Sequence, residues 1–144
     1  MSSSNDLARQ FPGLRSTDYE VQSAFDPNYN CIAWAARDTR EWWEPDPMET
    51  CYWPPDVPRE YSIGAYKAAF EALGYSECAD QDLEPGFEKV AIFAREGMPA
   101  HAARQKASGR WTSKLGRNVD IEHELEGLVG DFYGRVALVL KKSV

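Results

Sequence analysis

A change of hydrophobic pattern near residue 87 constrains the fold of this chain more than any other feature of its sequence. Before it, the segments that start at Cys31 and at Arg59 have the apolar spacing of amphipathic helices. After it, the segments 89–95, 100–105, 109–116 and 134–142 alternate like strands, with Ser108-Gly109 as a hairpin turn. Helices followed by a run of strands indicate an α+β fold with an antiparallel sheet of about four strands.

The length of 144 residues suits one domain with one hydrophobic core. Residues 1–16 are polar and irregular, and we expect them to form an N-terminal arm ahead of a single domain of residues 17–144. The segment "VDIEHELEGL" is predicted to be a short helix with Asp120 near its start. His123 within it is then expected on the helix surface or in a cap.

The net charge of −7 is unevenly distributed along the chain. Residues 1–87 hold 6 Lys/Arg and 16 Asp/Glu, a net −10, whereas residues 88–144 hold 10 and 7, a net +3. An acidic protein gains nothing from phosphate backbones, so we expect no nucleic-acid partner. No apolar run approaches the length of a membrane span and no export signal is visible, so we expect no membrane contact and a cytoplasmic location.

The three cysteines, Cys31, Cys51 and Cys78, are odd in number and lack metal-type spacing. With only two histidines, His101 and His123, the chain is predicted to hold no metal, no cofactor and no disulfide framework. We expect Cys51 and Cys78 to be structural.

Cys31 differs because it follows the turn sequence "DPNYN" and begins an apolar, alanine-rich run. Asn28 or Asn30 is a natural N-cap for such a helix. The free N–H groups and the dipole at a helix N-terminus favour a thiolate. A thiol nucleophile also needs a base within hydrogen-bond reach and a third group to orient that base. His101, at the predicted start of a strand, is the candidate base.

The stretches "YNCIAWA" and "HAARQKASGRWTS" resemble the papain-like cysteine amidases and peptidases of bacteria, which include the CHAP-type enzymes. The resemblance implies a papain-like fold in which N-terminal helices, one led by Cys31, pack on a small antiparallel sheet. It also implies His101 as the base and Ser113 on the next strand as the orienting group. A second register of the same resemblance puts Lys89 in the base position and His101 in the orienting position.

The whole chain also resembles a family of small bacterial proteins to which no activity is assigned. The shared motifs include "NCIAWA", "YWP", "HAARQ..G.WTSKLG", "I.H" and "YG.V", and they span residues 20–142.

Around the expected catalytic group, Asn30 and Lys114 are candidate substrate-binding residues, and the backbone N–H of Cys31 is the candidate oxyanion donor. A substrate groove is expected from Trp43 and Trp53 with Tyr52 between them.

We therefore expect a cysteine-dependent amidohydrolase or peptidase that acts on an amide or acyl substrate. The alternative is a non-enzymatic module, of the adaptor or immunity type, that keeps the papain-like fold. Its acidic N-terminal half and its aromatic, proline-rich loop 44–59 would bind a protein partner. An enzyme requires Cys31 beside His101, whereas a binding module does not.

Overall fold

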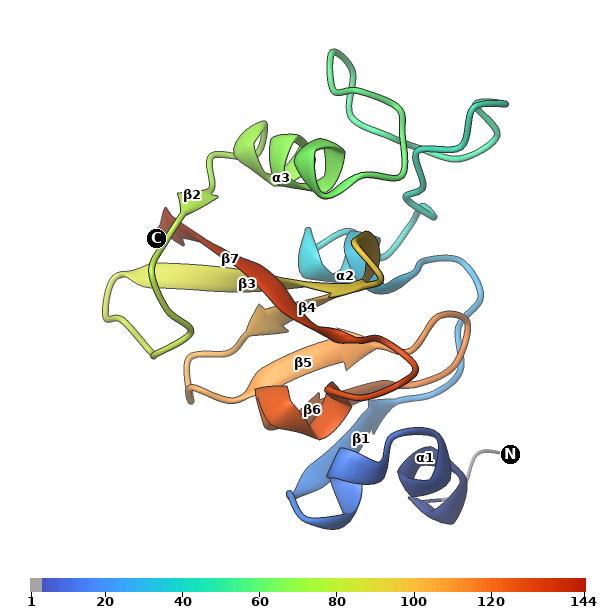
Figure 1. Cartoon of the computed structure of the whole chain (residues 1–144), viewed down its shortest axis with the longest axis vertical. Helices are drawn as coiled ribbons and strands as arrows, with labels where there is room; N and C mark the ends of the chain where they lie inside the picture. Colours follow the sequence, from blue (N-terminus) through green and yellow to red (C-terminus); the bar gives the residue numbers. More distant parts are fainter. Residues whose placement is uncertain (1–3) are drawn as a thin grey trace.

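The computed structural model describes residues 4–144 and shows one antiparallel sheet of seven strands with helices on both faces (Figure 1). The helical elements are α1 (Ser4–Gln10), η1 (Pro12–Arg15), α2 (Cys31–Ala35), α3 (Ile63–Glu71) and η2 (Leu125–Leu128). The strands are β1 (Tyr19–Ser23), β2 (Ser76–Glu77), β3 (Phe87–Arg95), β4 (Met98–Gln105), β5 (Trp111–Lys114), β6 (Asp120–His123) and β7 (Arg135–Ser143). Their order across the sheet is β1-β6-β5-β4-β3-β7-β2. The α+β class is confirmed, and the sheet is larger than expected.

Side chains of the central strands alternate between two hydrophobic clusters, because successive residues of a strand point to opposite faces. The first cluster contains Val90, Ile92, Ala102, Leu138 and Leu140 and is covered by α2 and α3. We call this side of the sheet the α2 face. The second cluster contains Ala91, Phe93, Ala103, Trp111, Ile121 and Val139 and is covered by α1, η1 and η2. We call this side the α1 face.

The helix that begins at Cys31 is shorter than its sequence suggests. The Asn30 side chain accepts a hydrogen bond from the Ala33 N–H, which is the predicted N-cap. Arg37 then adopts a left-handed backbone conformation with φ 66°, which ends the helix. Beyond it, the Asp38 carboxylate accepts from the N–H groups of Arg40 and Glu41 and so stabilises a turn in place of further helix.

The second helix on this face, α3, has the predicted apolar pattern, but it begins at Ile63 and not at Arg59 as predicted. The Ser62 side chain caps it through the Ala65 N–H. Its buried residues are Ala65, Tyr66, Ala69 and Phe70, which recur with helical spacing and face the sheet. Gly74, with φ 99°, follows its end as expected for a C-terminal stop.

Residues 1–16 are not an arm in the part that the structure describes. Leu7, Phe11 and Leu14 are buried in the cluster on the α1 face. Their spacing of four and three residues brings them to one side of α1 and η1, which pack beneath the sheet (Figure 1). Residues 1–3 lie outside the described residues. The segment predicted as an arm thus supplies part of the core.

The predicted helix at residues 119–128 is also wrong in its first half. Asp120–His123 form β6, which pairs with β5 and with β1, and only Leu125–Leu128 are helical, as η2. Ile121 and His123 alternate with Asp120 and Glu122, which is the period of a strand. This extra strand joins β1 to the sheet.

Candidate functional site

Cys31 is the first residue of α2 and contacts the core on the α2 face. The helix α2 packs on β4 and β5, and the backbone N–H of Ala102 in β4 acts to lower the pKa of the Cys31 thiol. Burial raises the pKa of the Cys31 thiol, although the N–H groups of Ala102 and Ile32 and the charge of Lys114 act in the opposite direction. The short helix therefore does not by itself produce a thiolate at neutral pH.

His101 projects from β4 to the opposite face, since it is the neighbour of Ala102 along the strand. Its ring is fully buried and stacks on Tyr133, with ring centroids 3.9 Å apart, and meets the edge of Phe93 at 5.3 Å. The Nδ1 atom of His101 has no hydrogen-bond partner among the described residues. No hydrogen bond joins Cys31 to His101 among the described residues, and the two side chains pack in different clusters, Cys31 on the α2 side and His101 on the α1 side.

Ser113 lies beside His101 as predicted, on the same face of the next strand. Its Oγ is 2.9 Å from His101 Nε2 and 2.7 Å from His123 Nε2, so one hydroxyl bridges two imidazoles. His123 was not expected in this cluster. The sequence feature that could have predicted it is the alternation of His123 with Ile121, which is the period of a strand. All three side chains are fully buried.

The hydrogen-bond chain fixes the tautomers of both histidines. His123 Nδ1 must donate to the Glu124 carbonyl at 2.7 Å, because a carbonyl only accepts. Neutral His123 then accepts at Nε2 from the Ser113 hydroxyl, and the Ser113 oxygen accepts from His101 Nε2–H. His101 Nδ1 is left as a bare lone pair, which agrees with its lack of a partner.

Both imidazoles are held neutral. Burial, followed by repulsion from His123, places the pKa of His101 well below its ordinary value. Burial is also the main cause that lowers the pKa of His123 to about 4, and Arg110 adds to it. With pKa values lowered in this way, both imidazoles are weak bases.

Lys114 faces the α2 side and is also fully buried. Its ammonium donates to the carbonyls of Asp26, Tyr29 and Gly116 at 2.5, 3.0 and 2.7 Å and lies 4.6 Å from the Tyr29 ring centroid. Burial lowers the pKa of Lys114, against the attraction of Asp26, Asp120 and Cys31. Since its three N–H groups already have acceptors, Lys114 anchors the segment that precedes α2.

The other predicted substrate-binding residues are committed to internal contacts. The Asn30 amide caps α2 and also bonds the backbone of Trp43, donating to its carbonyl at 2.7 Å and accepting from its N–H at 3.2 Å. Trp43 and Trp53 are buried in the core on the α2 face, with Tyr52 packed on Trp43. These two indoles are therefore not the walls of an open groove.

The second register is not formed either. The Lys89 ammonium bonds the Asp80 carbonyl at 3.0 Å and forms ion pairs with Asp80 and Glu84. These contacts hold Lys89 against the 78–86 connection, and Ser113, not Lys89, is the partner of His101.

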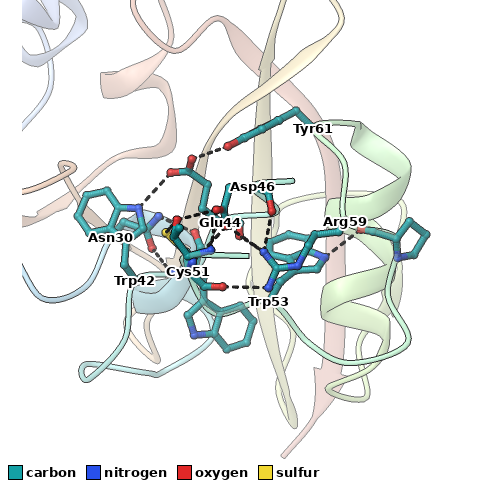
Figure 2. Close-up of polar contacts among 11 residues, drawn as sticks. Asn30, Trp42, Glu44, Asp46, Cys51, Trp53, Arg59 and Tyr61 are labelled. Atoms are coloured by element: carbon teal, nitrogen blue, oxygen red, sulfur yellow. Dashed lines mark hydrogen bonds and ion pairs between the residues drawn. The ribbon is translucent and has the colours of Figure 1, made fainter. Parts of the chain in front are cut away.

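Sequence reasoning missed a polar network inside the segment of residues 41–61, here called the 41–61 loop. The Arg59 guanidinium donates to the Asp46 carboxylate at 2.8 Å and to the carbonyls of Asp46 and Cys51 at 2.8 and 2.9 Å (Figure 2). Asp46 in turn accepts from the Thr50 hydroxyl at 2.6 Å, and this bond is the main cause that lowers the Asp46 pKa to about 2. Arg59 therefore holds together a loop that contains no regular helix or strand.

Outside this network, the same loop presents large side chains to solvent. Tyr61 donates its hydroxyl to Glu44, which raises the Tyr61 pKa to about 12, and Trp42 Nε1 donates to the same carboxylate at 3.1 Å (Figure 2). Tyr52 and Tyr61 are exposed, and Met48 is 82% exposed.

A comparison with protein-family models finds one match, described as "Domain of unknown function (DUF7689)", over residues 20–141. The chain belongs to the DUF7689 family. The matched range of this DUF7689 protein includes Cys31, the His101–Ser113–His123 chain, Lys114 and the 41–61 loop. No curated protein matches the chain, and no solved structure matches it.

None of the helices that the structure describes in this DUF7689 protein is both long and apolar enough to cross a membrane. Within residues 4–144, no three His, Cys, Asp or Glu side chains come together in a way that would hold a metal ion.

Proposed function

We propose that this protein is a non-enzymatic protein-binding module that keeps a papain-like arrangement of a cysteine-led helix on an antiparallel sheet. The observation that supports the proposal is that Cys31 packs against the cluster on the α2 face, whereas His101 is bonded to Ser113 in the cluster on the α1 face, with no hydrogen bond between them among the described residues. Cysteine amidases need a base beside the nucleophile, and the chain has only two histidines. Both belong to the buried chain on the α1 face.

Lys114 is a poor replacement for that base. Its positive charge acts on the Cys31 pKa, but three carbonyl acceptors hold the ammonium in its protonated form. Loss of its proton would leave one of the three buried carbonyls without a donor, which costs about 1–3 kcal/mol. Among the described residues, Lys114 is therefore poorly suited to serve as the base for Cys31 in acyl transfer.

The 41–61 loop supports binding of a protein. Arg59 fixes the loop from within, so a partner would not have to order it on binding. Exposed aromatic and methionine side chains are enriched in protein interfaces, and this loop offers Met48, Tyr52 and Tyr61.

The charge of the loop defines the chemistry of the partner. Residues 41–61 contain six carboxylates and a single basic side chain, Arg59, which is already paired with Asp46. A partner surface with basic groups around an apolar centre complements this loop.

Selection of a 12-residue phage-displayed peptide library on the immobilised protein tests the proposal. We expect enrichment of peptides that combine basic and apolar residues, and we expect Met48→Ser combined with Tyr52→Ser to weaken their binding at least tenfold. Phe132→Ser, which alters an exposed aromatic residue outside the loop, is the matched control and should leave binding unchanged. If no peptide depends on the loop, the proposal is wrong.

A further inference from the structure

Arg104, in β4, lacks part of the hydrogen bonding that a partly buried guanidinium group needs. It lies opposite Val90 and two residues beyond Ala102, so its side chain projects to the α2 face. There its guanidinium carbon lies 5.0 Å from the centroid of the Trp34 ring. The Nε atom of Arg104 is buried and has no hydrogen-bond partner among the described residues, none of which forms an ion pair with Arg104. Arginine characteristically presents its Nε–H and a terminal N–H together to one oxyanion, so the missing acceptor is of that kind.

Two more cations lie at the same end of the α2 face. Arg37 follows α2, and its guanidinium donates to Glu88 Oε2 at 2.6 Å. Lys142 lies opposite Glu88 in β7, and its ammonium is 5.7 Å from the centroid of the Tyr75 ring. Burial, followed by repulsion from Arg37, lowers the pKa of Arg104, so the two guanidinium groups are close enough to act on each other.

The carboxylates at this end of the face balance only part of the positive charge. Among the described residues, Glu88 is the one carboxylate bonded to any of the three cations. Asp120 also attracts Arg104, but it acts on the ammonium of Lys114 as well. Burial, followed by the charge of Glu88, raises the pKa of Tyr75 to about 12, so its hydroxyl is neutral at physiological pH. The group of three cations can therefore accept a further anion.

The number and placement of the cations favour a phosphate monoester over a carboxylate. A phosphate monoester carries a charge of about −1.5 to −2 near pH 7 and has three acceptor oxygens, which can accept from donors on separate elements. The donors here come from such separate elements: β4, the segment after α2, and the end of β7, which pairs with the start of β3 and with β2 (Figure 1). A single carboxylate is a planar monoanion that one guanidinium group can satisfy.

We propose that Arg104, Arg37 and Lys142 bind a phosphate monoester group at this end of the α2 face. Arg104 donates to the phosphate through its Nε–H and a terminal N–H. Arg37, whose side chain is 54% exposed, donates from the surface, and Lys142 supplies a third positive charge. The Trp34 ring, held by its bond to the Thr112 hydroxyl at 3.1 Å, keeps the Arg104 guanidinium in place before the ligand arrives.

The test follows the Arg104 Nε–H signal in two-dimensional proton–nitrogen NMR spectra of the full chain during titration with O-phospho-L-serine. Arg104→Lys identifies the signal by its loss. We expect a saturable shift of this signal, with an apparent Kd at least tenfold higher in Arg37→Gln. Arg135→Gln, which removes an exposed arginine at the other end of β7, is the matched control and should bind like the wild type.

A second measurement and a salt control make the result decisive. Isothermal titration calorimetry should show binding of O-phospho-L-serine at least tenfold weaker in Arg104→Lys, which keeps the charge but loses the paired N–H donors. Thermal unfolding checks that each variant is folded. Potassium chloride at the same ionic strength should leave the Arg104 signal in place. An equal shift with chloride, or unchanged affinity in Arg37→Gln, would overturn the proposal.

A pair of peptides identifies the source of the phosphate. Ac-AApSAA-NH2, with a phosphoserine at its centre, should bind, and Ac-AASAA-NH2 should not. Binding of the phosphopeptide at least tenfold tighter than O-phospho-L-serine assigns the phosphate to a phosphorylated protein, and equal binding of the two assigns it to a small phosphorylated molecule. Equal binding of the two peptides would contradict recognition of phosphate.

This inference is independent of the 41–61 loop. The loop variant Met48→Ser/Tyr52→Ser is expected to bind O-phospho-L-serine normally, so either proposal can fail while the other stands.

Discussion

Cys31 packs against the cluster on the α2 face, whereas the ring of His101 stacks on Tyr133 in the cluster on the α1 face. The two side chains that were expected to form a catalytic pair share no hydrogen bond among the described residues. Cys31 and His101 belong to different clusters. The residues of each cluster lead to separate testable predictions.

Ser113 bridges two imidazoles, so its removal should destabilise the fold. Ser113→Ala leaves the His101 Nε2–H and the His123 Nε2 lone pair buried without partners, at a cost of about 2–3 kcal/mol. Urea denaturation measures this cost. Ser108→Ala, in an exposed turn, is the control and should change stability by less than about 0.5 kcal/mol. If Ser113→Ala lost no more stability than Ser108→Ala, the hydrogen-bond chain of His101, Ser113 and His123 would not be formed.

The same two histidines should make the protein unstable in mild acid. Their folded pKa values are depressed below the ordinary 6.5, so the unfolded chain binds more protons as the pH falls through that value. The stability is present above about pH 6.5 and is lost toward about pH 4, with a slope of up to about 1.4 kcal/mol per pH unit for each histidine.

Urea denaturation at pH 7.5, 6.0 and 5.0 measures this slope. Carboxylates such as Asp46 titrate at lower pH and contribute little in this range. The slope should be smaller in His123→Asn. A free energy of unfolding that stays constant down to pH 5 would contradict the neutral buried pair.

Lys114 should be essential for stability although it is a charged residue. Lys114→Met keeps the length of the side chain but leaves the carbonyls of Asp26, Tyr29 and Gly116 without their donor, at about 3 kcal/mol in total. Lys67→Met removes an exposed pair with Glu77 and should leave the stability nearly unchanged. Similar losses in both variants, measured by chemical denaturation, would contradict the anchoring role.

Gly134 is predicted to tolerate no side chain. A Cβ there would lie 1.9 Å from the Ala94 carbonyl oxygen, and its φ of 77° is in the left-handed region, so Gly134→Ala should cost about 3 kcal/mol or more. At Gly86, φ is 86° and no atom lies within 4 Å of an added Cβ. A substitution there therefore measures the cost of backbone strain without a steric collision. Gly86→Ala should cost only about 1–2 kcal/mol, and thermal unfolding of both variants compares them. Equal losses of stability in the two variants would mean that the backbone moves to relieve the collision at Gly134.

The alternation of strands was enough to predict that His101 and Ser113 share a face. It could not show which face α2 covers, because a shift by one residue exchanges all the side chains of a strand between faces. Cys31 packs with the cluster on the α2 side and His101 with the cluster on the α1 side for that reason. Packing of α2 depends on contacts distant in sequence, such as the bond from Trp34 Nε1 to the Thr112 hydroxyl at 3.1 Å.

Other parts of the fold could be predicted from residues close together in the sequence. Asn30 and Gly74 were predictable as a helix cap and a helix stop because their chemistry is local. Leu7, Phe11 and Leu14 had helical spacing that a polar composition concealed. The network around Arg59 carried no periodic signal, since its acceptors are mostly backbone carbonyls.

The pH dependence of Cys31 carboxymethylation tests the central claim most directly. Iodoacetate labelling of the wild type, His101→Asn and His123→Asn, resolved by mass spectrometry of the Cys31 peptide, gives the apparent thiol pKa in each. The absence of a base predicts a half-maximal rate above the ordinary pKa of 9.0, or no labelling before unfolding, with the same profile in all three proteins. A half-maximal rate below about pH 7 in the wild type that is lost in His101→Asn but kept in His123→Asn would contradict it, because His101 would then act on the thiol.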